Sequence, residues 1–213
     1  MYGRQITPNR LGRLLVLSPE KFTPKGLTYK ELSHSQTPRR TDSSYRVHET
    51  QTKPFQITEL FNLERGHFHA IDRLKEGTYP TVSRTAEDNG ITGFHEKPKR
   101  AAVFQKFTLT ISTVTGDAFL QFYPFIATDN VVMCLPKKQL RLTTLAYVQT
   151  AIRKVKWRYS YGRQAYKRVL SKTVLFLHVN SEGNIDEDYI EGLVTRQPYW
   201  KAFLEKAKTI PET

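Results

Sequence analysis

The chain has 213 residues, of which 38% are hydrophobic and 12% aromatic, enough to bury the core of one large domain. Its formal net charge of +13 favours a polyanionic partner, with nucleic acid ahead of an anionic membrane surface. The sequence has no apolar run of membrane-spanning length, no lipid-binding amphipathic helix and no signal-peptide core, so we expect a cytoplasmic protein without a membrane partner.

The first 53 residues divide into two segments. Residues 1–17 repeat part of a later sequence, and residues 18–53 are rich in Ser, Thr, Pro, Lys and Arg without an apolar period. Such a composition is typical of a linker with little structure of its own. We therefore expect the globular domain to span residues 54–213.

Apolar and turn residues predict the first elements of this domain. Core-facing side chains begin at Phe55 and stop before Gly66, and residues 78–85 predict a short extended piece. Asp88-Asn89-Gly90 predicts a turn, because Asn and Gly tolerate positive φ. Strands follow over residues 104–113, 118–125 and 131–135, and their close spacing predicts an antiparallel, curled sheet.

The remaining part alternates helices with one apolar strand. Residues 139–156 predict a helix, because apolar side chains recur at three- and four-residue steps from Leu142 to Val155. Residues 172–179 predict a strand, a short helix begins near Ile185, and a last helix covers residues 198–208. Together these elements predict a mixed α+β fold with a twisted sheet and a few packed helices.

The positive charge is concentrated in one stretch. From Asn130 to Ser181 the chain has no Asp or Glu, whereas a solvated helix surface normally mixes signs to gain i,i+4 pairs. Eleven bases occupy these 52 residues: Lys137, Lys138, Arg141, Arg153, Lys154, Lys156, Arg158, Arg163, Lys167, Arg168 and Lys172. This stretch is typical of a phosphate-binding surface, and a merely basic solvated surface is the alternative.

A short internal repeat suggests a modular origin. The sequence Tyr-Gly-Arg-Gln occurs at residues 2–5 and again at residues 161–164, and an ungapped match continues to an apolar run at Leu17 and Phe176. We interpret residues 1–17 as the closing segment of a preceding similar module, which echoes residues 161–176. The chain is then a piece of a longer protein or one half of a two-fold assembly.

Several motifs together resemble a known family. In chain order they are Phe61…Gly66, Tyr79-Pro-Thr-Val-Ser-Arg-Thr, Asp88-Asn-Gly-Ile-Thr-Gly-Phe, Leu109-Thr-Ile…Gly116, Thr128-Asp-Asn-Val and Tyr159-Ser-Tyr-Gly-Arg. This set is similar to the target-recognition domains of type I restriction–modification specificity subunits, and to related domains of type IIG and type IIB systems. The similarity covers about residues 54–195.

The resemblance implies a fold, a function and partners. It implies a twisted sheet that holds loops against the major groove of double-stranded DNA, as the specificity part of a restriction–modification system. It also implies that partner subunits or domains carry adenine methylation and cleavage, with S-adenosylmethionine and Mg²⁺ bound there. Residues 187–208 are too short and too poor in heptads for the long spacer helices of a full specificity subunit. The chain is therefore expected to act as a homodimer or beside a second recognition module.

The sequence lacks the motifs of an enzyme of this kind. It contains neither a Pro-Pro-aromatic tetrapeptide nor a glycine-rich loop for a methyltransferase, and no nuclease Glu-x-Lys beside a partner acid. His67, His69 and His95 have no carboxylate or Cys at ligand spacing, so surface or hydrogen-bonded histidines are expected rather than a metal site. Cys134, the only cysteine, is expected to be buried. We therefore expect no catalytic residue, metal or cofactor in this chain.

Candidate DNA contacts fall in three groups. The first comprises Ser83, Arg84 and Thr85, for which turn formation is the alternative. The second, in a loop around Pro98, comprises Lys97, Lys99 and Arg100. The third and main group comprises Arg153, Lys154, Lys156, Arg158, Tyr159, Tyr161, Arg163 and Gln164.

Arg163 is the strongest single candidate. Gly162 beside it lets the backbone approach a ligand closely, and an arginine binds phosphate or guanine O6/N7 in a bidentate way. An internal ion pair is the alternative. The clustered Lys154, Lys156 and Arg158 favour phosphate contacts over base reading.

Tyr159 and Tyr161 are candidates for packing on DNA sugars, with the protein core as an equal alternative. Two other functions compete with sequence-specific DNA recognition: a nuclease that cuts the DNA it binds, and a structural RNA-binding protein. The positive charge alone does not distinguish DNA binding from RNA binding.

Overall fold

The computed structural model describes residues 51–68 and 70–208, which belong to one compact unit, and the predicted segment 1–17 and most of the predicted linker lie outside them. The strands are β1 (Gln51–Gln56), β2 (Phe61–Arg65), β3 (Glu76–Val82), β4 (Ile91–His95), β5 (Leu109–Ser112), β6 (Ala118–Leu120), β7 (Ile126–Ala127), β8 (Val131–Pro136) and β9 (Val174–Val179). The α-helices are α3 (Ile57–Leu60), α4 (Leu142–Lys154), α5 (Lys167–Leu170), α6 (Glu187–Thr195) and α7 (Trp200–Lys208). Three short 3-10 helices are η2 (Ile71–Arg73), η3 (Asp88–Gly90) and η4 (Lys156–Arg158).

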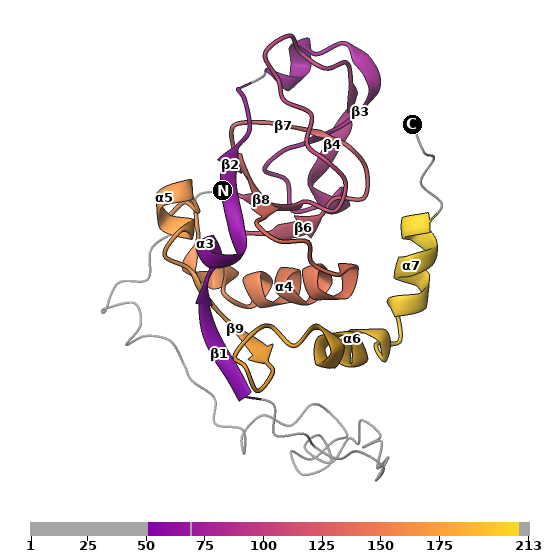
Figure 1. The fold of residues 1–213 in the computed structure, drawn as a ribbon. Coiled ribbons are helices and arrows are strands. Elements are labelled where there is room, and N and C mark those ends of the chain that lie inside the picture. Colours follow the sequence, from indigo (N-terminus) through magenta and orange to yellow (C-terminus); the bar gives the residue numbers. More distant parts are fainter. Residues whose placement is uncertain (1–50, 69, 209–213) are drawn as a thin grey trace, which may run out of the picture. The chain divides into compact units, whose positions relative to one another are not determined.

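A four-stranded antiparallel sheet, in the order β2-β8-β5-β6, lies at the centre of the unit (Figure 1). Both of its faces are covered, so β8 is apolar at every position rather than alternating. Val132 and Cys134 face one hydrophobic cluster, and Val131 and Met133 face a second cluster on the other side.

Helix α4 covers one face of this sheet, as Figure 1 shows. Its buried side chains Leu145, Val148 and Ile152 recur on one side of the helix and pack with Leu109 and Ile111 of β5. Helix α6 packs against α4. The predicted helix over residues 139–156 is therefore confirmed, with ends at 142 and 154.

A three-stranded sheet, in the order β4-β3-β7, covers the opposite face. Strand β3 pairs antiparallel with β4 and parallel with β7. The turn between β3 and β4 is η3, where Asn89 has φ 57° and Gly90 has φ 81°, as the Asp-Asn-Gly sequence predicted. The side chain amide of Asn89 donates to the Leu120 carbonyl at 2.9 Å, which ties the turn to β6.

Strands β1 and β9 form a separate two-stranded antiparallel ribbon. Residues 51–53, which composition assigned to the linker, belong to β1 and pair with Val179, His178 and Leu177. These residues form a strand because β9, more than 120 residues further along the chain, pairs with them, and no local sequence pattern indicates this pairing. The domain therefore begins before the predicted boundary at residue 54.

The mixed α+β prediction is confirmed, and the three strands expected over residues 104–135 do form antiparallel neighbours β6, β5 and β8. Strand β5 is shorter than predicted, because Phe107 has φ 63° and leaves only Leu109–Ser112 in extended pairing. Strand β6 ends early, at Leu120, whereas β8 extends one residue beyond its prediction, to Pro136. In the part of the chain that the structure describes, no helix has the length and apolarity to cross a membrane.

Burial makes the single thiol of the chain unreactive. Cys134 is fully buried on β8, and desolvation raises its pKa to about 12. Since thiol reagents attack the thiolate, a disulfide reagent at pH 8 should label less than one-tenth of the native chains and one thiol per chain after denaturation. Full labelling of the native protein would contradict this packing.

Candidate nucleic-acid interface

The loop after α4 is fixed to the central sheet by an ion pair. The Lys156 ammonium lies 2.6 Å from the Asp117 carboxylate, in the β5–β6 turn. The Asp117 side chain is only 5% exposed, whereas the Lys156 side chain is 45% exposed. A carboxylate this deeply buried needs a charged partner, so Lys156 secures the first residue of the loop.

Two buried residues anchor the rest of this loop, Tyr159 through its side chain and Ala165 through its backbone. The Tyr159 hydroxyl lies 2.5 Å from the Thr173 hydroxyl inside the core, and the Ala165 N–H donates to the Thr113 carbonyl at 2.7 Å. Gly116, with φ 70°, leaves the space that the Tyr159 ring fills, since a Cβ there would lie 2.7 Å from the ring. The loop is therefore anchored at 156, 159 and 165.

Between these anchors the chain forms a tight hairpin. The Arg163 N–H donates to the Ser160 carbonyl at 2.8 Å, and the Ser160 N–H donates back to the Arg163 carbonyl at 3.2 Å. Tyr161, at the tip, is 71% exposed, and Gly162 and Arg163 are exposed beside it. A rigid base thus presents a short, solvent-exposed tip.

Two other loops meet the β5–β6 turn. The Ser112 hydroxyl donates to the Arg84 carbonyl at 3.2 Å, in the segment after β3. The Thr113 N–H donates to the Asn130 carbonyl at 2.9 Å, in the β7–β8 turn. The segments 83–87, 113–117, 128–130 and 156–168 therefore converge, and we call their exposed surface the loop face.

Arg65, at the end of β2, connects two sides of the loop face. Its guanidinium binds the Asp129 carboxylate at 3.2 Å and lies 5.9 Å from the Tyr166 ring centre. Gly66 permits this approach, because a Cβ there would lie 2.1 Å from the Thr128 carbonyl oxygen. No pattern in the sequence indicates Arg65 as a site residue, since only the β2–β8 pairing brings it here.

A hollow of about 230 Å³ opens on the loop face. Its lining residues are Phe68, Ile71, Ser83, Arg84, Thr128, Asp129 and Asn130. Phe68 is 78% exposed and Arg84 is exposed, while Asn130 is half-buried. An exposed aromatic ring beside arginine and amide side chains is a combination that suits contact with base edges.

Besides Arg84 and Lys156, six exposed bases lie on the loop face or at the adjoining end of α4: Arg153, Lys154, Arg158, Arg163, Lys167 and Arg168. In the part of the chain that the structure describes, none of the six forms an ion pair with a carboxylate. Arg153 lies over the Phe119 ring at 5.7 Å and Arg158 over the Trp157 ring at 5.6 Å. These cations are available to a polyanion.

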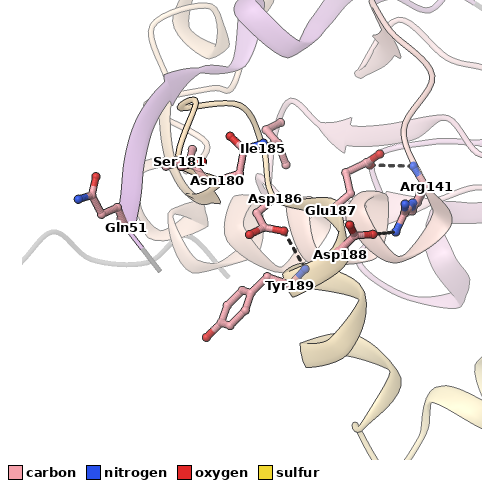
Figure 2. A pocket seen from close by; sticks show the side chains of 10 residues that line it. Gln51, Arg141, Asn180, Ser181, Ile185, Asp186, Glu187, Asp188 and Tyr189 are labelled. Carbon is pink, nitrogen blue, oxygen red and sulfur yellow. Dashed lines mark hydrogen bonds and ion pairs between the residues drawn. The ribbon is translucent and has the colours of Figure 1, made fainter. Parts of the chain in front are cut away.

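The first three bases of the acid-free stretch lie elsewhere. Arg141, at the start of α4, binds Asp188 of α6 at 2.5 Å (Figure 2). It also binds Glu191 at 2.7 Å, and the two carboxylates raise its pKa. Lys137 and Lys138 follow β8 at the end opposite Asn130, about 20 Å away at 3.3 Å per residue. The positive stretch is therefore divided, and only its second part forms the loop face.

The group in the Pro98 loop is also separate from the loop face. The Glu96 N–H donates to the Lys75 carbonyl, so Lys97, Lys99 and Arg100 lie where β3 begins. Arg84 follows the other end of β3, about 20 Å along the strand. All three bases are exposed, and their role as a second contact stays a prediction.

Four predicted contact residues have partners inside the protein. Ser83 and Tyr159 are buried, each with 7% of its surface exposed. Lys156 forms its ion pair with Asp117. The Thr85 hydroxyl accepts a hydrogen bond from the Glu87 N–H at 3.2 Å. Thr85 therefore takes part in a turn, which is the alternative to DNA contact named for this group. Gln164, between the hairpin and Ala165, is half-buried.

No metal-binding group is evident within residues 51–68 and 70–208, where no three His, Cys, Asp or Glu side chains gather. His69 lies outside these residues, and His95 is hydrogen-bonded to the Thr81 hydroxyl at 2.7 Å. A hollow of about 1030 Å³ lies beside α6, away from the loop face (Figure 2). Its acids Asp188 and Glu187 already bind Arg141 side-chain or backbone nitrogens.

Comparison with known proteins defines the family. Residues 49–174 match the family described as the type I restriction modification DNA specificity domain. The matched segment contains the central sheet, the hollow beside Arg84 and the whole loop 156–168. Since it covers more than half of the sequence, the chain belongs to this family, as the motifs indicated.

Individual relatives agree with this assignment. The specificity subunit S.BcgI of a type II restriction enzyme from Heyndrickxia coagulans is 26% identical over 146 residues, which are 67% of this chain and 42% of the relative. The type I restriction–modification S subunit from M. genitalium is 16% identical, with a TM-score of 0.50 over 78% of this chain and 47% of that one. The fold is therefore that of an S subunit domain.

The HsdS subunit from Thermoanaerobacter tengcongensis matches with a TM-score of 0.48 and 12% identity, over 74% of this chain and 38% of that chain. The chain thus spans less than half the length of each of these three relatives.

The Lys156–Asp117 pair should contribute to stability. Replacing Lys156 by Met leaves a buried carboxylate without its cation, and we expect the free energy of unfolding to fall by about 1–3 kcal/mol. Lys154→Met is the matched control, because Lys154 is exposed, two residues away and without an ion pair to any described carboxylate. Urea denaturation compares the two, and equal midpoints would remove the anchoring role of Lys156.

Proposed function

We propose that this chain binds double-stranded DNA sequence-specifically and serves as the specificity part of a restriction–modification system. The observation that carries the proposal is the loop face, where three segments converge on the β5–β6 turn and six exposed bases lack carboxylate partners among the described residues. Duplex DNA carries about one charge per 1.7 Å of axis and neutralises such a surface.

The arrangement of the loop face favours duplex DNA over structured RNA. Its exposed arginines lie on anchored loops, and residues of these loops line the hollow beside Arg84. This arrangement suits contact with base edges in an open groove. The deep, narrow major groove of an RNA duplex hides those edges from side chains. No specific observation supports the nuclease or the structural RNA-binding alternative.

Catalysis is proposed to reside outside this chain. S.BcgI is named as the specificity subunit of a restriction enzyme, and we infer that this chain likewise acts with separate catalytic subunits or domains. We place adenine methylation and cleavage, with S-adenosylmethionine and Mg²⁺, on partner subunits or domains in the cytoplasm. Because the chain spans less than half of its relatives, a homodimer or a second recognition module completes the proposed assembly.

Salt dependence tests the role of the loop face. Replacing both Lys167 and Arg168 by Gln removes two exposed charges, so we expect the slope of log affinity against log salt to become shallower by about 1.8. The measurement is fluorescence anisotropy on a duplex selected from a randomised pool.

Lys137→Gln with Lys138→Gln is the matched control, because it removes the same charge from the opposite end of β8. The slope of this variant should stay within about 0.3 of the parent value, since distant surface charges are screened. Equal slope changes in the two double variants would show that net charge, and not the loop face, determines binding.

Base reading is expected at the hollow beside Arg84. Arg84→Ala removes a bidentate donor, so the sequence selected from a randomised duplex pool should lose preference at one or two positions, worth about 1–3 kcal/mol. High-throughput sequencing of the bound pool measures this. An unchanged motif with uniformly weaker binding would assign Arg84 to phosphate.

A further inference from the structure

We propose that the hairpin Ser160–Gln164 is a sequence-independent clamp on the DNA backbone, in which the Gly162 N–H and the Arg163 guanidinium bind phosphate and no base is read. The inference rests on the proposed function, because it specifies which part of the duplex this segment of the loop face meets. Four observations support it: a glycine that the fold does not require, free backbone donors, short reach and the repeated sequence.

Gly162 has no explanation inside the protein. Apart from its two chain neighbours, a Cβ at this position would have no atom of the described structure within 4 Å, and the backbone does not have the positive φ that favours glycine. Gly116 differs on both points: its φ is 70°, and a Cβ added there would lie 2.7 Å from the Tyr159 ring. A tip residue without a side chain, where the fold tolerates one, allows an external group to approach the main chain.

The tip also carries available donors. Within the described part of the chain, the N–H groups of Tyr161 and Gly162 have no backbone acceptor, because the hairpin bonds involve only Ser160 and Arg163. Backbone N–H groups and arginines are frequent donors to phosphate oxygens. Arg163 is exposed and lacks an ion pair to a described carboxylate, so one phosphate can meet both groups.

The reach of the hairpin favours the rim of a groove. Only residues 160–164 project beyond the buried anchors Tyr159 and Ala165. Ser160 pairs with Arg163, so the turn Tyr161–Gly162 lies one to two residues, or about 3–7 Å, beyond these anchors. The major groove is about 8.5 Å deep, so the hairpin backbone meets the phosphates at its edge rather than the bases at its floor.

The repeated sequence supports the same conclusion independently. Tyr-Gly-Arg-Gln occurs at residues 2–5 as well as 161–164. We interpreted the first copy as the closing segment of a preceding module. A tetrapeptide identical in two modules fits a contact that does not depend on base sequence, and the sugar–phosphate backbone is the part of DNA that every site presents.

The experiment compares Arg163→Ala and Gly162→Ala with the parent, using the full chain. Each protein selects from a pool of duplexes with a randomised centre, and its affinity is measured on the selected duplex and on a shuffled duplex. Lys138→Ala is the control for loss of one surface charge away from the loop face. Thermal melting checks folding, and the open space at Gly162 predicts an unchanged melting temperature.

The clamp predicts an unchanged selected motif in both variants, with affinity lowered by the same factor, roughly tenfold, on both duplexes. Arg163→Ala should also make the salt slope shallower by about 0.9. A motif altered at one or more positions in Arg163→Ala, or Gly162→Ala binding with the parent's affinity, would overturn the clamp while leaving the proposed function intact.

The proposed function fails separately. A parent protein that binds duplexes without selecting any motif is not a specificity component, and uniform weakening by the two variants would then still support the clamp. A parent that binds no duplex overturns both proposals.

Discussion

The buried carboxylate of Asp117 is the constraint on which the loop face depends. It stands in the β5–β6 turn of the central sheet with only 5% of its side chain exposed, and a charge so enclosed is costly without a counterion. Lys156 provides the counterion and is also the first residue of the loop that carries Arg158 and Arg163. The core of the protein thus determines where the exposed cations lie.

The same organisation separates the two ends of α4 electrostatically. Arg141 at the first end is neutralised by Asp188 and Glu191 of α6, whereas Arg153 and Lys154 at the last end have no described carboxylate in ion-pair distance. Cations also suit the negative end of the helix dipole. Of the two ends of α4, only the last therefore offers positive charge that no described carboxylate neutralises, and this end adjoins the loop face.

Within the loop face, the residues that fix the loops differ from the residues that are exposed to solvent. Tyr159, Lys156 and Ser83 have partners inside the protein and fix the loops, while exposed neighbours meet the solvent. The bonds that hold the loops do not involve the exposed side chains at the tips, so the position of the loops does not depend on those side chains.

The sequence by itself determined the elements with local causes: the apolar period of α4, the continuous apolar run of β8 and the positive-φ turn at Asn89. It also determined the family, because several motifs kept their order. Tertiary structure alone decided that β1 begins at residue 51, that Arg65 reaches the loop face and that Lys156 is an anchor. These outcomes depend on partners 39 to 128 residues away, and charge and hydropathy patterns carry no record of which distant groups will meet.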